Sequence, residues 1–361
     1  MKNFSMIVIS LVLGVSLSMS FSAQGMDIQK NALTEKDFSK IRYMFPLGTR
    51  WSSATEALGH YFKNNPLLSP DKKFRSVGTY IIADDIYSIA LGPDGKSILA
   101  GLKDSRALFL SLPPRALKGH TGAVEAVAIN SDGTKAVTGS DDMTARVWDL
   151  VTGRELFVLK GHTAPLRSVA FSSNGKTIVT GSEDKTARVW DTDTGTELKT
   201  LKGHTGAVVS AAFSPDGQTI VTGSTDTTAL LWNPITGTPQ GTIKGHKGAL
   251  NTVAFSPTEN TLLTSSDDRT ARLWDSKTGK ELQLFKGHTG PVSSASFSHD
   301  GKTVLTSSED ETIRIWDTTT GKQLELLTGH EDEVDRAIFG AHDTTIISKS
   351  VDDRVILWKR I

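Results

Sequence analysis

Short runs of alternating hydrophobic and polar residues, separated by turn residues, fill the chain from Phe74 to the C-terminus. In the first unit, apolar residues recur over residues 86–91, 98–99 and 108–110. Alternation over a few residues, bounded by turn signals, indicates half-buried β-strands. Dipeptides such as Asp132-Gly133 supply the positive φ that a tight hairpin needs. The pattern therefore predicts an all-β protein built from many short antiparallel strands.

The strand pattern repeats with a constant period of 42 residues. Each repeat begins with a Gly-His dipeptide and carries a tryptophan 28 residues after the histidine. A fixed period of this length indicates a solenoid, a propeller or an array. Short strands between turns favour the propeller over the helical solenoids. Two hairpins depart from the Asx-Gly pattern, at residues 258–260 and 341–343, and are expected to differ in shape.

The repeat resembles the WD-repeat family of β-propellers from about residue 74 to the C-terminus, with six clear units and one degenerate unit. This resemblance implies a seven-bladed propeller in which each clear repeat holds a buried tetrad of histidine, hydroxyl, aspartate and tryptophan. The tetrad positions are His120, Thr138, Asp142, Trp148; His162, Thr180, Asp184, Trp190; His204, Thr222, Asp226, Trp232; His246, Thr264, Asp268, Trp274; His288, Thr306, Asp310, Trp316; and His330, Ser348, Asp352, Trp358.

These tetrads are interpreted as structural networks and not as catalytic groups. Each polar group would destabilise the fold if it were buried without a partner, whereas a closed chain of donors and acceptors satisfies all four. The first unit keeps only Asp104, because Ile82, Ala100 and Leu110 occupy the other three positions.

Closure of the ring requires a strand from the N-terminal side. Only three residues follow Trp358, so the last unit has no room for a fourth strand of its own. An open edge would leave hydrogen-bonding groups exposed. Residues 75–82 are expected to supply that strand, which sets the propeller domain at residues 74–361.

The first 25 residues have the pattern of a signal peptide: one lysine, an uncharged run, and then small residues. Cleavage after Ser22 and cleavage after Gly25 both fit, and an uncleaved anchor is the alternative. With no cysteine in the chain, this pattern predicts an exported protein, periplasmic or secreted, with a bacterial source favoured. No transmembrane span is expected in the mature chain.

Residues 26–73 do not repeat. Apolar spacings of three and four residues, at Phe38, Ile41 and Met44 and again at Leu58 and Tyr61, predict two short helices in this segment. A helical hairpin lying on the propeller is favoured over an independent functional module.

Composition excludes several classes of function. The 40 basic and 40 acidic residues balance, so no global positive field attracts nucleic acid. No motif for nucleophilic catalysis or for a cofactor stands out, and six of the nine histidines belong to tetrads. The expected function is a monomeric, non-enzymatic scaffold that binds a protein or peptide partner, without cofactor or metal. The alternatives are an enzyme with a site at the channel mouth and a purely structural envelope or surface protein.

The WD-repeat resemblance also implies where a partner would bind. The implied positions lie three and five residues after each Gly-His histidine and one residue before each tetrad aspartate. Eight of these residues are acidic and two are basic, which favours a basic segment, although an acid before the aspartate is also common in the repeat itself. Asp85, Tyr87, Glu333 and Asp335 are expected to form the centre of the site, at the seam between first and last units. The candidate residues are Asp85, Tyr87, Lys103, Glu125, Asp141, Arg167, Glu183, Asp267, Glu309, Glu333 and Asp335.

Overall fold

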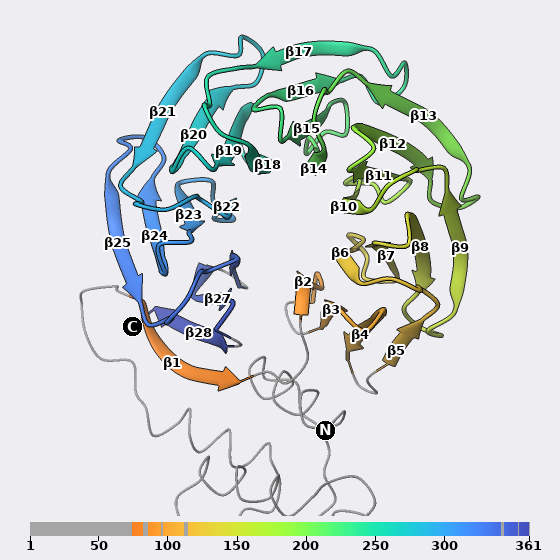
Figure 1. The fold of residues 1–361 in the computed structure, drawn as a ribbon, viewed down its shortest axis with the longest axis horizontal. Coiled ribbons are helices and arrows are strands. Elements are labelled where there is room, and N and C mark those ends of the chain that lie inside the picture. Colours follow the sequence, from red (N-terminus) through yellow and green to blue (C-terminus); the bar gives the residue numbers. More distant parts are fainter. Residues whose placement is uncertain are drawn as a thin grey trace, which may run out of the picture.

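The computed structural model describes residues 74–81, 86–94, 97–111, 115–340, 343–352 and 354–360. Within these residues, 28 strands form seven four-stranded antiparallel sheets, arranged as blades around a central axis (Figure 1). The predicted all-β, seven-bladed propeller is confirmed. The expected signal peptide and the two expected helices lie outside the described residues. The described part of the chain contains no α-helix, and so no helix that could cross a membrane.

The blades follow one another along the chain, and the innermost strand of each comes first in blades 1 to 6. Blade 1 contains β2 (Ile86–Leu91), β3 (Ile98–Leu102), β4 (Arg106–Leu110) and β5 (Arg115–Lys118); blade 2 contains β6 (Val124–Ile129), β7 (Lys135–Ser140), β8 (Thr144–Asp149) and β9 (Glu155–Lys160). Blade 3 contains β10 (Leu166–Phe171), β11 (Thr177–Ser182), β12 (Thr186–Asp191) and β13 (Glu197–Lys202); blade 4 contains β14 (Val208–Phe213), β15 (Ile220–Ser224), β16 (Ala229–Trp232) and β17 (Pro239–Ile243). Blade 5 contains β18 (Leu250–Phe255), β19 (Thr261–Ser266), β20 (Thr270–Asp275) and β21 (Glu281–Lys286); blade 6 contains β22 (Ser294–Phe297), β23 (Thr303–Ser307), β24 (Thr312–Asp317) and β25 (Gln323–Thr328). Blade 7 contains β26 (Arg336–Phe339), β27 (Thr345–Lys349), β28 (Arg354–Arg360) and β1 (Phe74–Ile81).

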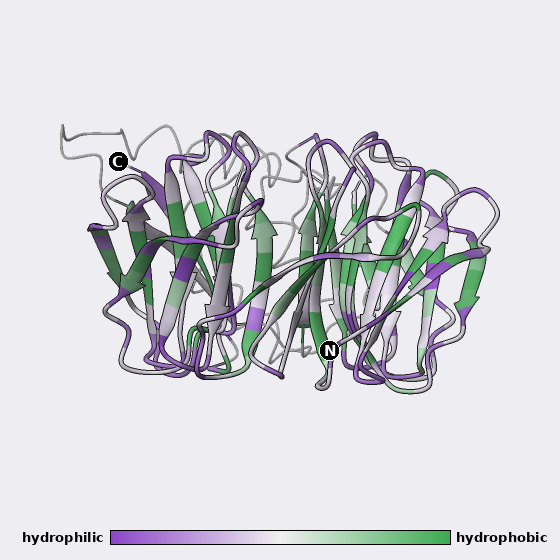
Figure 2. Cartoon of the chain, turned by 90° about the horizontal axis from the view of Figure 1, so that it is seen from above, coloured by the Kyte–Doolittle hydropathy of each residue, from purple (hydrophilic) through white to green (hydrophobic). Residues whose placement is uncertain are grey.

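The hydrophobic core lies between neighbouring blades. Val137 and Val147 of blade 2, for example, pack in one cluster with Leu166, Ile178 and Trp190 of blade 3. Figure 2 shows the hydrophobic residues along the strands and the hydrophilic ones mainly in the loops at the two ends. Each blade therefore buries its faces only when both neighbours are present.

Side-chain hydroxyls on the innermost strands also link successive blades. Ser168 Oγ accepts a hydrogen bond from the backbone N–H of Ala211 in the next blade, at 2.9 Å. The seam between blades 7 and 1 is different, because Arg336 takes the hydroxyl position. Its Nη1 donates to Ser88 Oγ at 3.1 Å. A long cationic side chain thus joins the last blade to the first.

Strand β1 closes the ring by pairing with β28 in an antiparallel register. It covers residues 74–81, within one residue of the expected stretch. Phe74, at its start, is only 4% exposed and packs in the cluster that contains Trp358. Its backbone N–H donates to Glu325 Oε1 of blade 6 at 2.6 Å. The two ends of the propeller are therefore held in one blade.

Blade 1 replaces the polar tetrad with apolar packing. Ala100, Leu108 and Leu110 are buried in a cluster shared with Leu357 of blade 7. Asp104, at the position of the tetrad aspartate, instead accepts from Arg106 Nε at 2.7 Å near the surface. This blade is held by hydrophobic contact and strand pairing.

Candidate functional site

The six complete repeats each form the same chain of hydrogen bonds. In blade 2, Trp148 Nε1–H donates to Thr138 Oγ1 at 2.9 Å, and this hydroxyl lies 2.7 Å from His120 Nε2. The other ring nitrogen, Nδ1, lies 2.8 Å from Asp142 Oδ2. Because the tryptophan can only donate and the carboxylate can only accept, the hydroxyl donates to Nε2 and Nδ1–H donates to the aspartate. Blade 7 uses Ser348 in place of threonine and has longer histidine–aspartate distances of 3.1 and 3.3 Å.

Burial and hydrogen bonding set the charge states of these tetrads. Burial alone raises the pKa of Asp142, but hydrogen bonds from His120, Thr144 and Thr121 outweigh it and hold that pKa well below its usual range. Burial lowers the pKa of His162 more strongly than Asp184 raises it. The pairing of neutral histidine with charged aspartate is therefore favoured at neutral pH. The histidines are 7–9% exposed, so the tetrads do not present reactive groups to solvent.

The Gly-His face is defined as the end of the propeller that carries the Gly-His dipeptides and the turns before the tetrad aspartates. On blades 2 and 3 of this face, one cation holds three of the candidate carboxylates. Arg167 Nη1 lies 3.1 Å from both Glu125 Oε2 and Asp141 Oδ1, and Arg167 Nε donates to Glu183 Oε1 at 2.8 Å. Burial raises the pKa of Glu125 despite this partner. The acidic residues of blades 2 and 3 are thus paired with a cation of the protein itself.

Blades 5 to 7 of the Gly-His face carry acidic residues without such a partner. Among the described residues, none forms an ion pair with Asp267, Glu309 or Glu333; Asp267 Oδ1 accepts one hydrogen bond, from the Asn251 amide at 2.8 Å. Partial burial and the nearby carboxylates of Glu333, Asp267 and Asp335 raise the pKa of Glu309. Asp267, Glu309 and Glu333 are exposed at this surface. We call these three residues the acidic sector.

The seam between blades 7 and 1 is more mixed in charge than the sequence suggested. Asp335 forms an ion pair with Lys349, a residue that the sequence analysis did not select. Arg336 and Lys349 line the same small hollow as Tyr87, which is 37% exposed. Asp85 lies outside the described residues. The expectation was a group of three carboxylates around the Tyr87 ring. Among the described residues of this seam, the structure adds two cations, Arg336 and Lys349.

One further candidate lies apart from these groups. Lys103, on the turn of blade 1, is exposed. Across the described residues, no group of three or more histidine, aspartate or glutamate side chains is placed to hold a metal ion.

Comparison with known families agrees with this geometry. The WD domain, G-beta repeat, matches residues 112–149, 153–191, 195–233, 237–275 and 279–317, which together make up more than half of the chain. The chain belongs to the WD40 repeat family. The structure adds two blades to these five WD40 matches, the apolar blade 1 and the composite blade 7.

Relatives of this WD40 protein include ribosome biogenesis proteins of fungi. The protein erb1 of Aspergillus niger is 34% identical over 88 residues, and that of Botryotinia fuckeliana is 36% identical over 85 residues. These segments cover 24% and 23% of this chain and 11% of each relative. The ERB1 protein of Chaetomium thermophilum is 33% identical over 88 residues. The expectation of an exported, periplasmic or secreted bacterial protein is wrong on this comparison, since these relatives are fungal ribosome biogenesis proteins.

Proposed function

We propose that this protein is a non-enzymatic interaction scaffold that holds a basic segment of a partner protein on the acidic sector of its Gly-His face. WD40 repeats and the rigid, closed ring support a scaffold role in general. The choice of a basic segment comes from the charges on blades 5 to 7.

The observation that carries this proposal is the environment of Glu309. Its neighbours Glu333, Asp267 and Asp335 all act to raise its pKa, and of these three only Asp335 forms an ion pair with a described base, Lys349. Like charges held close together repel one another, so a lysine or arginine placed among them removes repulsion and adds attraction. The ring fixes the backbone that carries these residues before binding, so only their side chains have to be ordered.

Blades 2 and 3 are less suited to be the main contact with a basic segment. Arg167 already neutralises part of the charge of Glu125, Asp141 and Glu183. A cationic segment would have to compete with that guanidinium for the same oxygens. The Gly-His face thus carries one group of carboxylates that is paired with Arg167. The carboxylates of the acidic sector have no such partner among the described residues.

The other functional classes have less support. The buried tetrad histidines and aspartates bond to one another, which leaves no nucleophile and base pair directed at solvent among them. The fungal relatives share only a segment of about two repeats with this chain, and that similarity favours a role in protein assemblies over an enzymatic one. We therefore draw from it a protein partner and not a particular pathway.

Two charge-matched triple variants test the proposal. The first, Asp267→Asn/Glu309→Gln/Glu333→Gln, removes the acidic sector; the second, Glu125→Gln/Asp141→Asn/Glu183→Gln, removes the carboxylates paired with Arg167. The probe is a fluorescein-labelled peptide of alternating lysine and glycine, followed by anisotropy at two salt concentrations. The first variant should bind about tenfold or more weakly and with a flatter salt dependence, because three attractions of about 0.5 to 1 kcal/mol are lost. Equal losses in both variants would contradict the proposal, since both change the net charge by the same amount.

A further inference from the structure

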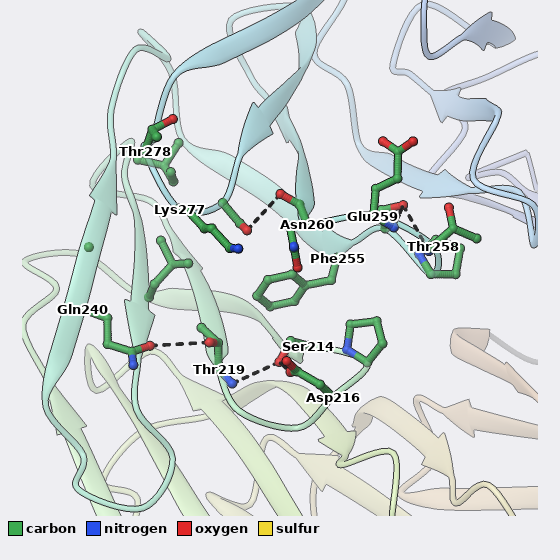
Figure 3. A pocket seen from close by; sticks show the side chains of 18 of the residues that line it. Ser214, Asp216, Thr219, Gln240, Phe255, Thr258, Glu259, Asn260, Lys277 and Thr278 are labelled. Carbon is green, nitrogen blue, oxygen red and sulfur yellow. Dashed lines mark hydrogen bonds between the residues drawn. The ribbon is translucent and has the colours of Figure 1, made fainter.

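A cavity of about 520 Å³ opens between blades 4 and 5, at the opposite end of the propeller from the Gly-His face. Leu231, Ile243 and Phe255 are its apolar lining side chains besides prolines, and most of the other lining residues are polar. Figure 3 shows Phe255 and Asn260 on one side of this cavity and Gln240 and Thr219 on another. Its size falls in the range of pockets that enclose small ligands or side chains.

The cavity exists because one side chain of the repeat is missing. Arg115, Phe157 and Lys199 occupy the same position, 42 residues apart, in the outer strands of blades 1 to 3. Each packs on the Thr-Gly turn of the following blade. A methyl group built on Gly195 would lie 2.8 Å from Phe157 Cβ, and one built on Gly237 would lie 3.3 Å from Lys199 Cδ. Blade 4 has Gly241 at this position and so no side chain to pack on the next turn. A methyl group built on Gly279, in that turn, would have as its nearest atoms the Thr242 carbonyl oxygen, at 3.5 Å, and an Ile243 methyl group.

A second departure from the repeat widens the same junction. The hairpin of blade 5 carries Thr258, Glu259 and Asn260 instead of an Asx-Gly turn, as the sequence had indicated. In blade 3, Asn174 caps the turn by accepting from the N–H of Lys176 at 3.0 Å. In blade 5 the Ser256 hydroxyl accepts the N–H groups of residues 258 and 259 instead, at 3.4 and 3.3 Å. Two independent changes at one junction thus produce one cavity.

The charge at the rim indicates what would fill it. Lys277 forms no ion pair with a described residue, and Figure 3 shows its side chain extending toward Asn260 and Phe255. Asp216 on the opposite rim already accepts from Ser214 Oγ at 2.6 Å and from the Gln218 N–H at 3.0 Å. Glu259 also lines the cavity, but its carboxylate points away from Lys277 (Figure 3). The Lys277 ammonium therefore faces a cavity whose lining combines the apolar side chains of Leu231, Ile243 and Phe255 with polar ones.

We propose that this cavity binds a linear segment of a partner protein that inserts a phenylalanine side chain beside Gly241 and places an adjacent carboxylate on Lys277. The inserted ring takes the place that Phe157 fills at the junction of blades 2 and 3. Contact of the inserted ring with Leu231, Ile243 and Phe255 accounts for affinity, and the Lys277 ammonium selects an acidic neighbour. This site is separate from the acidic sector and selects the opposite charge, so either proposal can fail without the other.

Nuclear magnetic resonance of the full chain, labelled with ¹⁵N, tests the site with a defined probe. The probe is the acetylated, amidated peptide Gly-Ser-Phe-Asp-Gly-Ser. Saturable shifts of the Gly241 and Gly279 amide signals are expected. Replacing Phe by Ala in the peptide should weaken binding by about tenfold or more, and replacing Asp by Asn should weaken it about two- to fivefold. No saturable shift at these two glycines, or a set of shifts located elsewhere, would overturn the proposal.

Variants of the protein complete the test. Gly241→Phe fills the cavity as Phe157 does, and should retain the wild-type melting temperature while binding is lost. Gly241→Gln, which copies Gln283 of the next blade, serves if the larger ring disturbs folding. Lys199→Phe introduces the same residue one blade earlier and should leave binding unchanged. Lys277→Gln should make the Asp and Asn peptides bind equally. Unchanged binding by a folded Gly241→Phe or Gly241→Gln protein would contradict the site.

Discussion

Ser76 lies opposite Trp358 in the antiparallel pair that closes the ring. Trp358 also donates from Nε1 to Ser348 Oγ at 2.8 Å, so the strand that completes the last tetrad is also the strand that receives β1. Ring closure and the last of the six tetrads are thus coupled in blade 7. The stability of the propeller depends on a strand that precedes the first repeat.

Replacing Phe74 with alanine tests that dependence. The Phe74 side chain is buried in one cluster with Trp358 and Phe339, so its loss should lower the free energy of unfolding by about 3 kcal/mol or more. Chemical denaturation measures the change. Arg75→Ala on the same strand is the control, because that side chain is exposed and should cost less than about 0.5 kcal/mol. Similar small losses at both positions would show that β1 adds little to closure.

The tetrads predict a second difference in stability. Asp226→Ala removes the acceptor of both the His204 ring and the Thr205 backbone N–H. Leaving those donors without a partner should cost about 1 to 3 kcal/mol. Asp104→Ala removes only a surface contact with Arg106 and should cost less. Denaturant midpoints of the two variants compare the losses directly, and equal losses would refute the role of the network.

Acid should destabilise the fold in two stages. Burial lowers the pKa values of His162, His246, His288 and His330 below the usual value of about 6.5, so the unfolded chain binds protons before the folded one does. Their contribution is complete above about pH 6.5 and decreases as the pH falls from there. The lowered pKa values of the tetrad aspartates add a second loss below about pH 4. Denaturant midpoints that stayed constant from pH 7 to pH 5 would contradict this assignment.

Arg167 provides a test within the Gly-His face. Its guanidinium lies among carboxylates from two blades, so Arg167→Gln should destabilise the protein by about 1 to 2 kcal/mol. The loss should shrink in high salt, which screens the repulsion left among Glu125, Asp141 and Glu183. The same variant should bind the lysine peptide more tightly, because it frees a second group of carboxylates. Weaker peptide binding would show that Arg167 supports the acidic face in another way.

The repeat made most of the architecture predictable. Period, turn dipeptides and the tetrad residues determine where each strand begins and ends, because they mark the same points in every blade. The repeat also predicts a closing strand before the first unit, and β1 pairs with β28. Even the cavity has a trace in the sequence, since Gly241 stands in register with Phe157, Lys199 and Gln283.

Contacts between blades were not predictable in the same way. The sequence shows that Glu125 and Arg167 occupy the same position of successive repeats, but not that the distance between blades lets their side chains meet. Likewise, Lys349 reaches Asp335 across paired strands, a contact that depends on side-chain direction. Only the structure therefore separates the carboxylates of the Gly-His face that are paired with a cation from those that are not.

The central claim is that the acidic sector on blades 5 to 7 binds a basic segment. Its most direct test is to titrate the ¹⁵N-labelled full chain with the lysine–glycine peptide and map the amide signals that shift. The claim predicts saturable shifts at Asp267, Glu309 and Glu333 that weaken as salt is added, with smaller changes at Glu125, Asp141 and Glu183. Shifts spread evenly around the Gly-His face, or centred on blades 2 and 3, would contradict it.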